Sequence, residues 1–339
     1  MNLEHTIDGF AQLGDLIIRE LDAKKLDPIL SSAYHHNPWF NEQFSILALS
    51  NIANHLLRKD KLSTWLEMYH HNAAPNSKKV AIIMAGNIPL VGWHDLMCVL
   101  LSGHEAQIKL SSKDEILPKY LIEKLIELLP DLKSKIHIAE RLSSFDAVIA
   151  TGSSNTSRYF DYYFGKYPHI IRKNRSSVAI LNGNETNHQL YLLGKDIFSY
   201  YGLGCRNVNK IYVPASFDFT NMLDNFQSYD AEVDFNKYDN NYTYQKSIML
   251  INKIPHLDNG FLLVKEDQNI ASAVSVLHYE KYNNLEELKA NLERDKEAIQ
   301  CIVGDSHHGI ANVPFGQSQS PELWDYPDGV DTFKFLLSL

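Results

Sequence analysis

The chain has 339 residues, of which 45% are hydrophobic and 22% charged, the usual balance of a soluble globular protein. The formal net charge is −9 and no basic run occurs, which argues against nucleic-acid binding because that relies on clustered Lys and Arg. No stretch approaches about 18 consecutive apolar residues, so we expect no membrane span. The N-terminus lacks the layout of a signal peptide, and we therefore expect a cytoplasmic enzyme.

Residues 1–75 are predicted to be helical, because apolar residues recur at the helical period in the segment 10–21. From residue 79 onward, apolar strands alternate with helical segments. This alternation predicts an α/β fold whose parallel sheet is covered by helices on both faces. The expected strands are 80–86, 105–111, 135–140, 145–152 and 176–181, and the expected helices between them are 87–103, 116–130 and 155–166.

After residue 182 the pattern changes, and we predict a second α/β domain. Residues 217–260 are rich in Asp, Asn and Tyr and show no clear regularity. An amphipathic helix is predicted to start after Asn283 or Asn284, either of which is a good helix cap. The other expected elements are a helix near 189–201 and strands at 210–214, 272–280 and 300–305.

Cys205 is the first residue with a chemical interpretation. It follows Gly202-Leu203-Gly204, where the backbone can turn sharply, and it precedes Arg206, whose guanidinium would favour the thiolate. The alternative is a small buried residue without chemistry. Cys98 and Cys301 lie within apolar segments, so we expect both in the core. Three widely spaced cysteines indicate neither a disulfide framework nor a zinc site.

Three further turns follow predicted strands, where open α/β sheets bind ligands. Asn87 can either donate to a developing oxyanion or cap the next helix. Lys109 can hold ribose hydroxyls or a phosphate, or be a solvated surface residue. Thr151-Gly152-Ser153 can receive an anion or a cofactor edge, or be a plain cap. The adjacent pairs His70-His71 and His307-His308 lack partners at ligand spacing, so we predict no metal site.

Taken together and in their order along the chain, these turns and their flanking segments resemble the aldehyde dehydrogenase superfamily. Within it they are most similar to the acyl-CoA reductases of the bacterial luminescence type (LuxC-like). The resemblance covers the chain from about residue 36 to its end. It is carried by AGNIPLVGWHDL (85–96), IKLSSKD (108–114), ATGSSNTSRYF (150–160), YFGKYPHIIRKNRSSVAIL (163–181), GLGCRNV (202–208) and VPFGQSQSPELW (313–324).

The resemblance implies that Cys205 is the nucleophile and that Asn87 completes an oxyanion hole with the cysteine N–H. It implies that Lys109 binds the adenosine ribose, with Thr151, Gly152 and Ser153 beside the cofactor. Pro314-Phe315-Gly316 matches a late turn that lines the substrate side. The implied parts are an N-terminal helical segment (1–75), a Rossmann-like nucleotide-binding domain (76–182), a catalytic cysteine domain (183–310) and a C-terminal segment that completes the active site (311–339).

Two departures from the family pattern refine the expected chemistry. The stretch IIRKNRSSV (170–178) stands where hydrolytic members carry a water-activating glutamate, and it contains no carboxylate. The absence of a water-activating glutamate favours transfer of the acyl group over its hydrolysis. In the segment Ser111-Ser112-Lys113, Ser112 replaces a glutamate that holds both ribose hydroxyls, and Lys113 can pair with a 2′-phosphate. We therefore expect NADPH (NADP) as cofactor rather than NADH.

The expected function is that of an acyl-CoA or acyl-protein thioester reductase. It would form an acyl-cysteine and reduce it with NADPH to a fatty aldehyde. Two alternatives are an aldehyde dehydrogenase that produces free acid and a catalytically silent scaffold that binds an acyl carrier. The expected partners are acyl-CoA or an acyl carrier protein, with a homo-oligomer possible. The aromatic residues of 159–167 either line an acyl channel or, as we expect, pack in the core.

Overall fold

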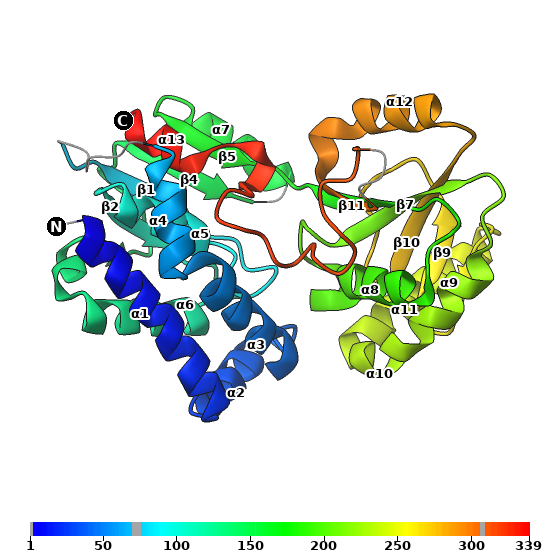
Figure 1. The fold of residues 1–339 in the computed structure, drawn as a ribbon, viewed down its shortest axis with the longest axis horizontal. Helices are drawn as coiled ribbons and strands as arrows, with labels where there is room; N and C mark the ends of the chain where they lie inside the picture. The colour runs from blue at the N-terminus through cyan, green and yellow to red at the C-terminus, as the bar shows by residue number, and fades with distance from the viewer. Residues whose placement is uncertain (1–2, 70–75, 153, 306–308) are drawn as a thin grey trace. The chain divides into compact units, whose positions relative to one another are not determined.

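The computed structural model describes residues 3–69, 76–152, 154–305 and 309–339, and the chain divides into two compact units (Figure 1). The first unit comprises residues 1–174 and 320–339, and the second comprises residues 175–319. The predicted division after residue 182 differs from this one. Strand β6 (Ser176–Ile180) pairs with strands of the second unit, so the chain leaves the first unit before that strand begins.

The first unit is built on a five-stranded parallel sheet with the order β3-β2-β1-β4-β5. From β1 the chain adds β2 and β3 on one side and then β4 and β5 on the other. The topological switch point, where neighbouring loops diverge, therefore lies between β1 and β4. The strands are β1 (Lys79–Ile83), β2 (Glu105–Lys109), β3 (Ile136–Ile138), β4 (Ala147–Thr151) and β5 (His169–Arg172).

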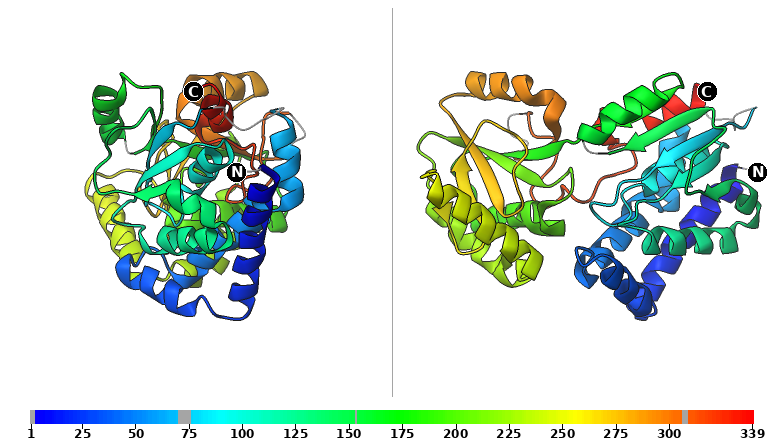
Figure 2. Two further views of the ribbon diagram at one scale, coloured as in Figure 1. Left: turned by 90° about the vertical axis from the view of Figure 1, so that its left-hand side faces the viewer. Right: turned by 180° about the vertical axis from the view of Figure 1, so that it is seen from behind.

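Helices cover both faces of this sheet, with α6 and α7 on opposite faces (Figure 2). The N-terminal helices are confirmed, and α1 buries the apolar stripe Phe10, Leu13 and Ile17. The helix expected from residue 87 begins only at Trp93, because residues 87–92 form turns. The helices are α1 (Leu3–Asp22), α2 (Asp27–His36), α3 (Glu42–Asn51), η1 (Ile52–Leu56), α4 (Lys59–Glu67), α5 (Trp93–Leu101), α6 (Ile116–Leu128), η2 (Pro130–Ser134), α7 (Ser154–Phe164), η7 (Pro327–Gly329) and α13 (Thr332–Leu337).

The second unit contains a six-stranded sheet with the order β11-β6-β7-β10-β9-β8, parallel except for β8. The chain runs from β6 to β7, forms β8 and β9 at the far edge, and inserts β10 between β7 and β9; it then crosses the sheet to place β11 on the other side of β6. The switch point of this sheet thus lies between β6 and β11. The remaining strands are β7 (Val208–Pro214), β8 (Leu257–Asp258), β9 (Leu263–Glu266), β10 (Val276–Tyr282) and β11 (Ile299–Gly304).

One face of the second sheet is covered by α12 and the other by α8, α9 and α11 (Figure 1). Asn284 caps α12 by accepting a hydrogen bond from the Glu287 N–H, as expected. Residues 217–260 are largely helical, although their sequence showed no clear regularity. The elements are α8 (Asn187–Phe198), η3 (Ser199–Gly202), α9 (Phe219–Phe226), η4 (Gln227–Tyr229), α10 (Asp230–Val233), α11 (Asn236–Ile251), α12 (Leu285–Asp295) and η5 (Lys296–Ala298).

The α/β class with parallel sheets is confirmed. In the part of the chain that the structure describes, every helix is too short or too polar to cross a bilayer.

Candidate active site

In the first unit, the turns that follow β1 and β2 pack directly against each other. A Cβ atom added to Gly86 would lie only 2.4 Å from the Ser111 Oγ, so this position requires glycine. The Met84 N–H donates to the Lys109 carbonyl at 3.1 Å. Asn87, which is exposed, is therefore held beside the segment that starts at Lys109.

The structure argues against the capping role considered for Asn87. Helix α5 begins at Trp93 with Gly92 in the capping position, five residues beyond Asn87. The turn between them contains Leu90 with a φ of 61°, a left-handed conformation that non-glycine residues seldom adopt. Asn87 is thus presented by a turn of specific shape and not by the start of a helix.

Asp114 stabilises that turn, and the sequence analysis missed it. Its Oδ2 accepts a hydrogen bond from the Leu90 N–H at 2.7 Å, and the side chain is only 4% exposed. Burial raises the pKa of Asp114 to about 7. The other oxygen, Oδ1, is buried and has no hydrogen-bond partner within the described residues. In sequence, an aspartate after two serines and a lysine looks like an ordinary surface turn.

The predicted cofactor segment Ser111-Ser112-Lys113 has a fixed backbone; the side chains of Ser112 and Lys113 are exposed, and that of Ser111 is half-buried. The Asp114 N–H donates to the Ser111 carbonyl at 3.0 Å, which closes a turn. At the end of α2, His36 Nε2 lies 2.8 Å from the Ser112 carbonyl oxygen. Asn37 Nδ2 donates to the Lys113 carbonyl at 3.1 Å. The side chains of Lys109, Ser112 and Lys113 reach solvent from this backbone.

Thr151 and Gly152 lie at the same sheet edge as Asn87. Strands β1 and β4 are parallel neighbours with Ile83 opposite Ala150, so both turns follow the two strands that flank the switch point. Ser153 lies outside the described residues. The structure therefore gathers Asn87, Lys109, Ser111–Lys113 and Thr151–Gly152 along one carboxyl edge.

In the second unit, Cys205 lies in the turn that precedes β7. The fully buried Asn207 holds this turn, since its Oδ1 accepts from the Gly204 N–H at 2.8 Å. Asn207 Nδ2 donates to the carbonyls of Asp196 and Ser199 at 3.1 and 2.8 Å. One amide side chain thus ties the cysteine turn to the end of α8.

Of the three cysteines, all of which the structure describes, only Cys205 is not buried. Its carbonyl accepts a hydrogen bond from Ser177 Oγ at 3.1 Å. Cys98 and Cys301 lie in the core, as expected. Burial raises the pKa of Cys98 well above its usual value, which keeps that thiol protonated and inert.

The segment Pro314-Phe315-Gly316 is tethered to the elements that hold Cys205. The carboxylate of Asp196 accepts hydrogen bonds from the N–H groups of Gly316 and Ser318 at 2.6 and 2.9 Å. Arg206 Nε donates to the Ser318 carbonyl at 2.5 Å. Asp196 is 1% exposed, and burial raises its pKa to about 6. Asp196 and Asn207 were both missed by the sequence analysis.

The stretch 170–178, which contains no carboxylate, includes one buried arginine. Arg172 is 3% exposed and forms a short ion pair with Asp95. Its Nη2 also donates to Thr332 Oγ1 at 2.8 Å. The Arg172 side chain is therefore part of the buried core of the first unit.

The expectation for the aromatic residues of 159–167 is wrong in part. Tyr159, Tyr162 and Tyr163 are 67, 83 and 62% exposed, whereas Phe160 and Phe164 pack against Val148 and Ala150.

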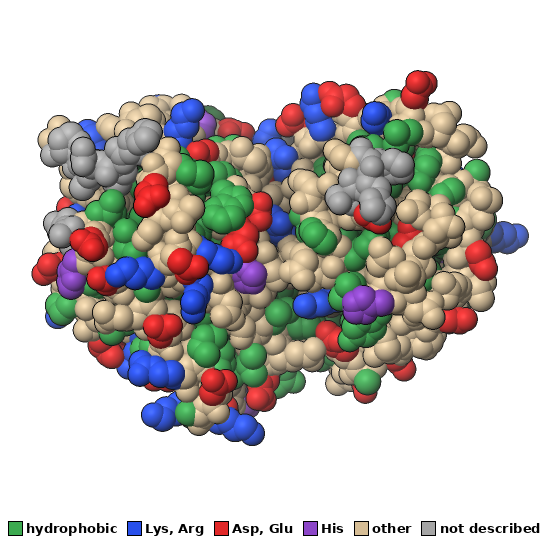
Figure 3. Space-filling view, viewed as in Figure 1, with side chains coloured by type: hydrophobic (Ala, Val, Ile, Leu, Met, Phe, Trp, Pro, Cys, Tyr) green, Lys and Arg blue, Asp and Glu red, His purple; other side chains and the backbone are tan. Residues whose placement is uncertain are grey.

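On the face shown in Figure 3, acidic and basic side chains are interspersed. No group of three or more His, Cys, Asp or Glu residues that could hold a metal occurs within the described ranges. The pairs His70-His71 and His307-His308 lie outside them.

No family model and no curated protein matches the sequence. Solved structures do resemble the fold. Aldehyde dehydrogenase 21 from Physcomitrella patens, in complex with succinate, has a TM-score of 0.68 at 11% identity, over 100% of this chain and 84% of that chain. The aldehyde dehydrogenase of Mycobacterium tuberculosis in complex with NAD⁺ has a TM-score of 0.56 at 15% identity, over 86 and 71%.

A variant of aldehyde dehydrogenase C from Pseudomonas syringae, in complex with NAD⁺ and octanal, has a TM-score of 0.60 at 11% identity, over 86% of this chain and 70% of that chain. At such identities the likeness concerns the fold. The chain thus has the aldehyde dehydrogenase fold, with one α/β unit on a parallel sheet and a second on a mixed sheet.

Proposed function

We propose that the protein is an acyl-CoA or acyl-protein thioester reductase that forms an acyl-Cys205 intermediate and releases a fatty aldehyde. The observation that carries this proposal is the cysteine turn of the second unit. Cys205 is partly exposed, and Asn207 fixes the backbone around it. Asp196 and Arg206 hold the 314–318 segment against the same elements. Such fixed positioning suits a nucleophile.

The proposed chemistry begins with attack of the Cys205 thiolate on the thioester carbonyl. A new C–S bond forms, the bond to the donor thiol breaks, and that thiol takes a proton as it leaves. The Cys205 N–H and the Asn87 amide donate to the carbonyl oxygen while it carries negative charge. NADPH, when bound, would supply a hydride to the carbonyl carbon of the acyl-cysteine; the C–S bond to Cys205 then breaks, which gives the aldehyde and the free thiolate.

The residues of the first unit suit a nucleotide with an added phosphate. Lys109 and Lys113 are exposed at the carboxyl edge of a parallel sheet, where such ligands bind. Ser112 brings no charge, and the single carboxylate of the 108–114 segment, Asp114, is buried against Leu90. A 2′-phosphate would thus meet a lysine and no exposed carboxylate, which favours NADPH over NADH.

An aldehyde dehydrogenase that makes free acid is less well supported. Hydrolysis of the acyl-cysteine needs a base for water, and the stretch 170–178 contains no carboxylate. Its Arg172 is buried against Asp95. The Pseudomonas syringae protein of the same fold is in complex with NAD⁺ and octanal. An aliphatic carbonyl substrate is therefore compatible with this fold.

The decisive experiment is intact-mass spectrometry after mixing the protein with myristoyl-CoA in the absence of NADPH. We expect one acyl adduct on the parent, which NADPH then removes as aldehyde. Cys205→Ala should give no adduct, while the matched variant Cys301→Ala should be acylated like the parent. An adduct on Cys205→Ala, or none on the parent, overturns the proposal. Release of free acid on adding NADP⁺ to octanal would favour the dehydrogenase instead.

A further inference from the structure

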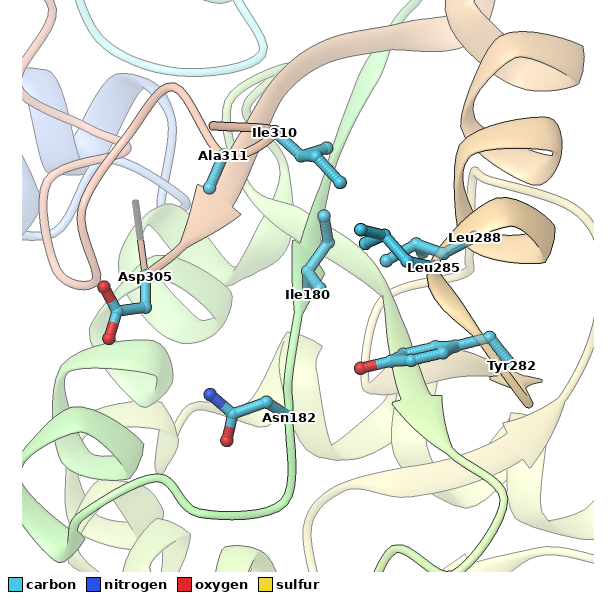
Figure 4. A pocket seen from close by; sticks show the side chains of 8 residues that line it. All are labelled: Ile180, Asn182, Tyr282, Leu285, Leu288, Asp305, Ile310 and Ala311. Carbon is cyan, nitrogen blue, oxygen red and sulfur yellow. The ribbon is translucent and has the colours of Figure 1, made fainter. Parts of the chain in front are cut away.

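The switch points of the two sheets differ in the side chains that line them. At that of the second unit lies a hollow of about 220 Å³, and apolar side chains converge on one side of it (Figure 4). In the first unit, the turn that follows β1 is held by a buried carboxyl group, that of Asp114. A carboxyl group whose second oxygen is buried without a partner among the described residues is costly, so its presence calls for a physical explanation.

The turn between β1 and α5 contains a backbone conformation that its own sequence disfavours. Leu90 has a φ of 61°, in the left-handed region, where the Cβ atom crowds the following carbonyl. Such a conformation persists where the surrounding structure imposes it. Leu90 is 4% exposed, and its N–H donates to Asp114 Oδ2 at 2.7 Å. This hydrogen bond is therefore a constraint that keeps Leu90 in its unusual conformation.

Asn87 lies between two points at which the 111–114 turn holds the turn after β1. The first point is Gly86, where an added Cβ atom would lie 2.4 Å from Ser111 Oγ and 3.2 Å from Lys113 Cβ. The second point is Leu90, which is held by Asp114. Because Asn87 directly follows the first point and shortly precedes the second, a displacement of Leu90 would also displace the Asn87 amide.

The position of Asp114 is itself fixed from outside its turn. Just past the end of α2, Asn37 Nδ2 donates to the Lys113 carbonyl at 3.1 Å, and Asn37 is 8% exposed. The Asp114 N–H donates to the Ser111 carbonyl at 3.0 Å. The carboxyl group of Asp114 therefore connects an anchored turn to the strained residue Leu90.

We propose that Asp114 is a positioning residue for acyl transfer, because its carboxyl group holds Leu90 and thereby keeps the Asn87 amide where it donates to the substrate oxygen. The inference rests on the proposed function, since it needs Asn87 as an oxyanion donor. In this role Asp114 touches neither the substrate nor the cofactor. Its removal should therefore slow the chemical step and leave the binding of acyl-CoA unchanged.

The test measures the single-turnover rate of acylation by myristoyl-CoA without NADPH, followed by intact mass. Omitting NADPH separates the effect on Asn87 from any disturbance of the adjacent cofactor segment. Asp114→Ala should lower the maximal rate about 10- to 50-fold, as expected when a hydrogen bond to a charged group is lost. The concentration of myristoyl-CoA that gives half the maximal rate should change by no more than about twofold. Asp114→Asn keeps an oxygen acceptor for the Leu90 N–H and should stay within about threefold of the parent rate.

A double-mutant cycle shows whether Asp114 acts through Asn87. In an Asn87→Ala background no amide is left to position, so adding Asp114→Ala should change the rate by no more than about twofold. Two single effects that multiply overturn the inference, because Asp114 would then act independently of Asn87. An Asp114→Ala rate equal to that of the parent overturns it too, as does an Asp114→Asn variant that is as slow as Asp114→Ala.

The matched control is Asp146→Ala, which removes the acceptor of the Lys79 N–H at the amino end of β1. This variant should keep the parent rate, and an equal slowing in it overturns the inference. If Asp114→Ala melts below the assay temperature, Asp114→Val takes its place, because valine fills the buried space and accepts no hydrogen bond. In all these outcomes the proposed function stands. No acylation of the parent overturns the proposed function, and the inference with it.

Discussion

The candidate residues lie at different ends of the strands in the two sheets: at carboxyl ends in the first unit and at an amino end in the second. In the first unit, Asn87, Lys109 and Thr151 all follow strands and gather around the β1–β4 switch point. In the second unit, Cys205 precedes its strand, and the switch point holds an apolar hollow instead. The first arrangement uses a general property of parallel sheets, whereas the second depends on specific side chains that tether a turn. We expect substitutions in the tethering network to cost more activity than those in exposed turns that only contact the cofactor.

The largest effect that we expect from the first unit is at Asn87, whose amide is proposed to donate to the substrate oxygen. Asn87→Ala should lower kcat by about 10²- to 10³-fold, the usual cost of one such donor. Steady-state turnover with acyl-CoA and NADPH measures this, with the melting temperature as a control. A kcat of the variant within a few-fold of the parent value would show that the Asn87 amide does not stabilise the oxyanion.

Asp196 tests the tethering network of the second unit. Asp196→Ala removes the acceptor of two backbone N–H groups, so the 314–318 segment should lose its fixed position. We expect turnover to fall by about 10- to 100-fold, as for the loss of one or two hydrogen bonds to a charged group. Because the pKa of Asp196 is raised to about 6, parent activity should decline as the pH falls through that value. The control Asp258→Ala, in β8, should keep the parent rate.

Ser112 tests the cofactor edge of the first unit. Ser112→Glu places a carboxylate near the proposed 2′-phosphate and should shift the ratio of kcat/KM for NADPH to that for NADH by about tenfold towards NADH, since about 1.4 kcal/mol corresponds to that factor. The substitution is exposed, so the fold should be unaffected. An unchanged ratio would show that Ser112 does not face the ribose. A parent that uses NADH equally well would contradict the proposed preference.

The smallest effect expected is on stability, at Asp114. Its folded-state pKa is raised to about 7, above the usual 3.8, so the native state binds this proton more tightly than the unfolded chain does. The resulting stabilisation is present at low pH and is lost as the pH rises through about 7. Asp114→Asn should remove this decline, which falls between about pH 4 and 7 and has a slope of at most about 1.4 kcal/mol per pH unit.

Urea unfolding at several pH values measures the Asp114 effect. Asp131→Asn, at an exposed position of η2, serves as the matched control and should keep the parental pH dependence. Identical pH profiles for the parent and Asp114→Asn would show that the buried carboxyl does not titrate in this range.

The sequence predicted features that depend on local chemistry. Buried strands are continuous apolar runs, so β1 and β4 could be found, and the glycines before Cys205 pointed to its turn. The tethers could not be found, because Asp196 and Gly316 meet only through folding, 120 residues apart. Residues 217–260 were missed as helices because α11 buries little apolar surface and has no clear hydrophobic face. Tyr162 was placed in the core because helical spacing does not tell which face of α7 meets the sheet.

The ion pair between Arg172 and Asp95 has a consequence for the origin and redesign of this chain. A glutamate at position 172 would put two carboxylates together in the core and leave Thr332 without its guanidinium partner. Breaking a buried pair in this way costs about 3–5 kcal/mol, a large part of the stability of most domains. Position 172 can therefore change only together with Asp95, in evolution or in redesign, because a change at either residue alone leaves a buried charge without its partner.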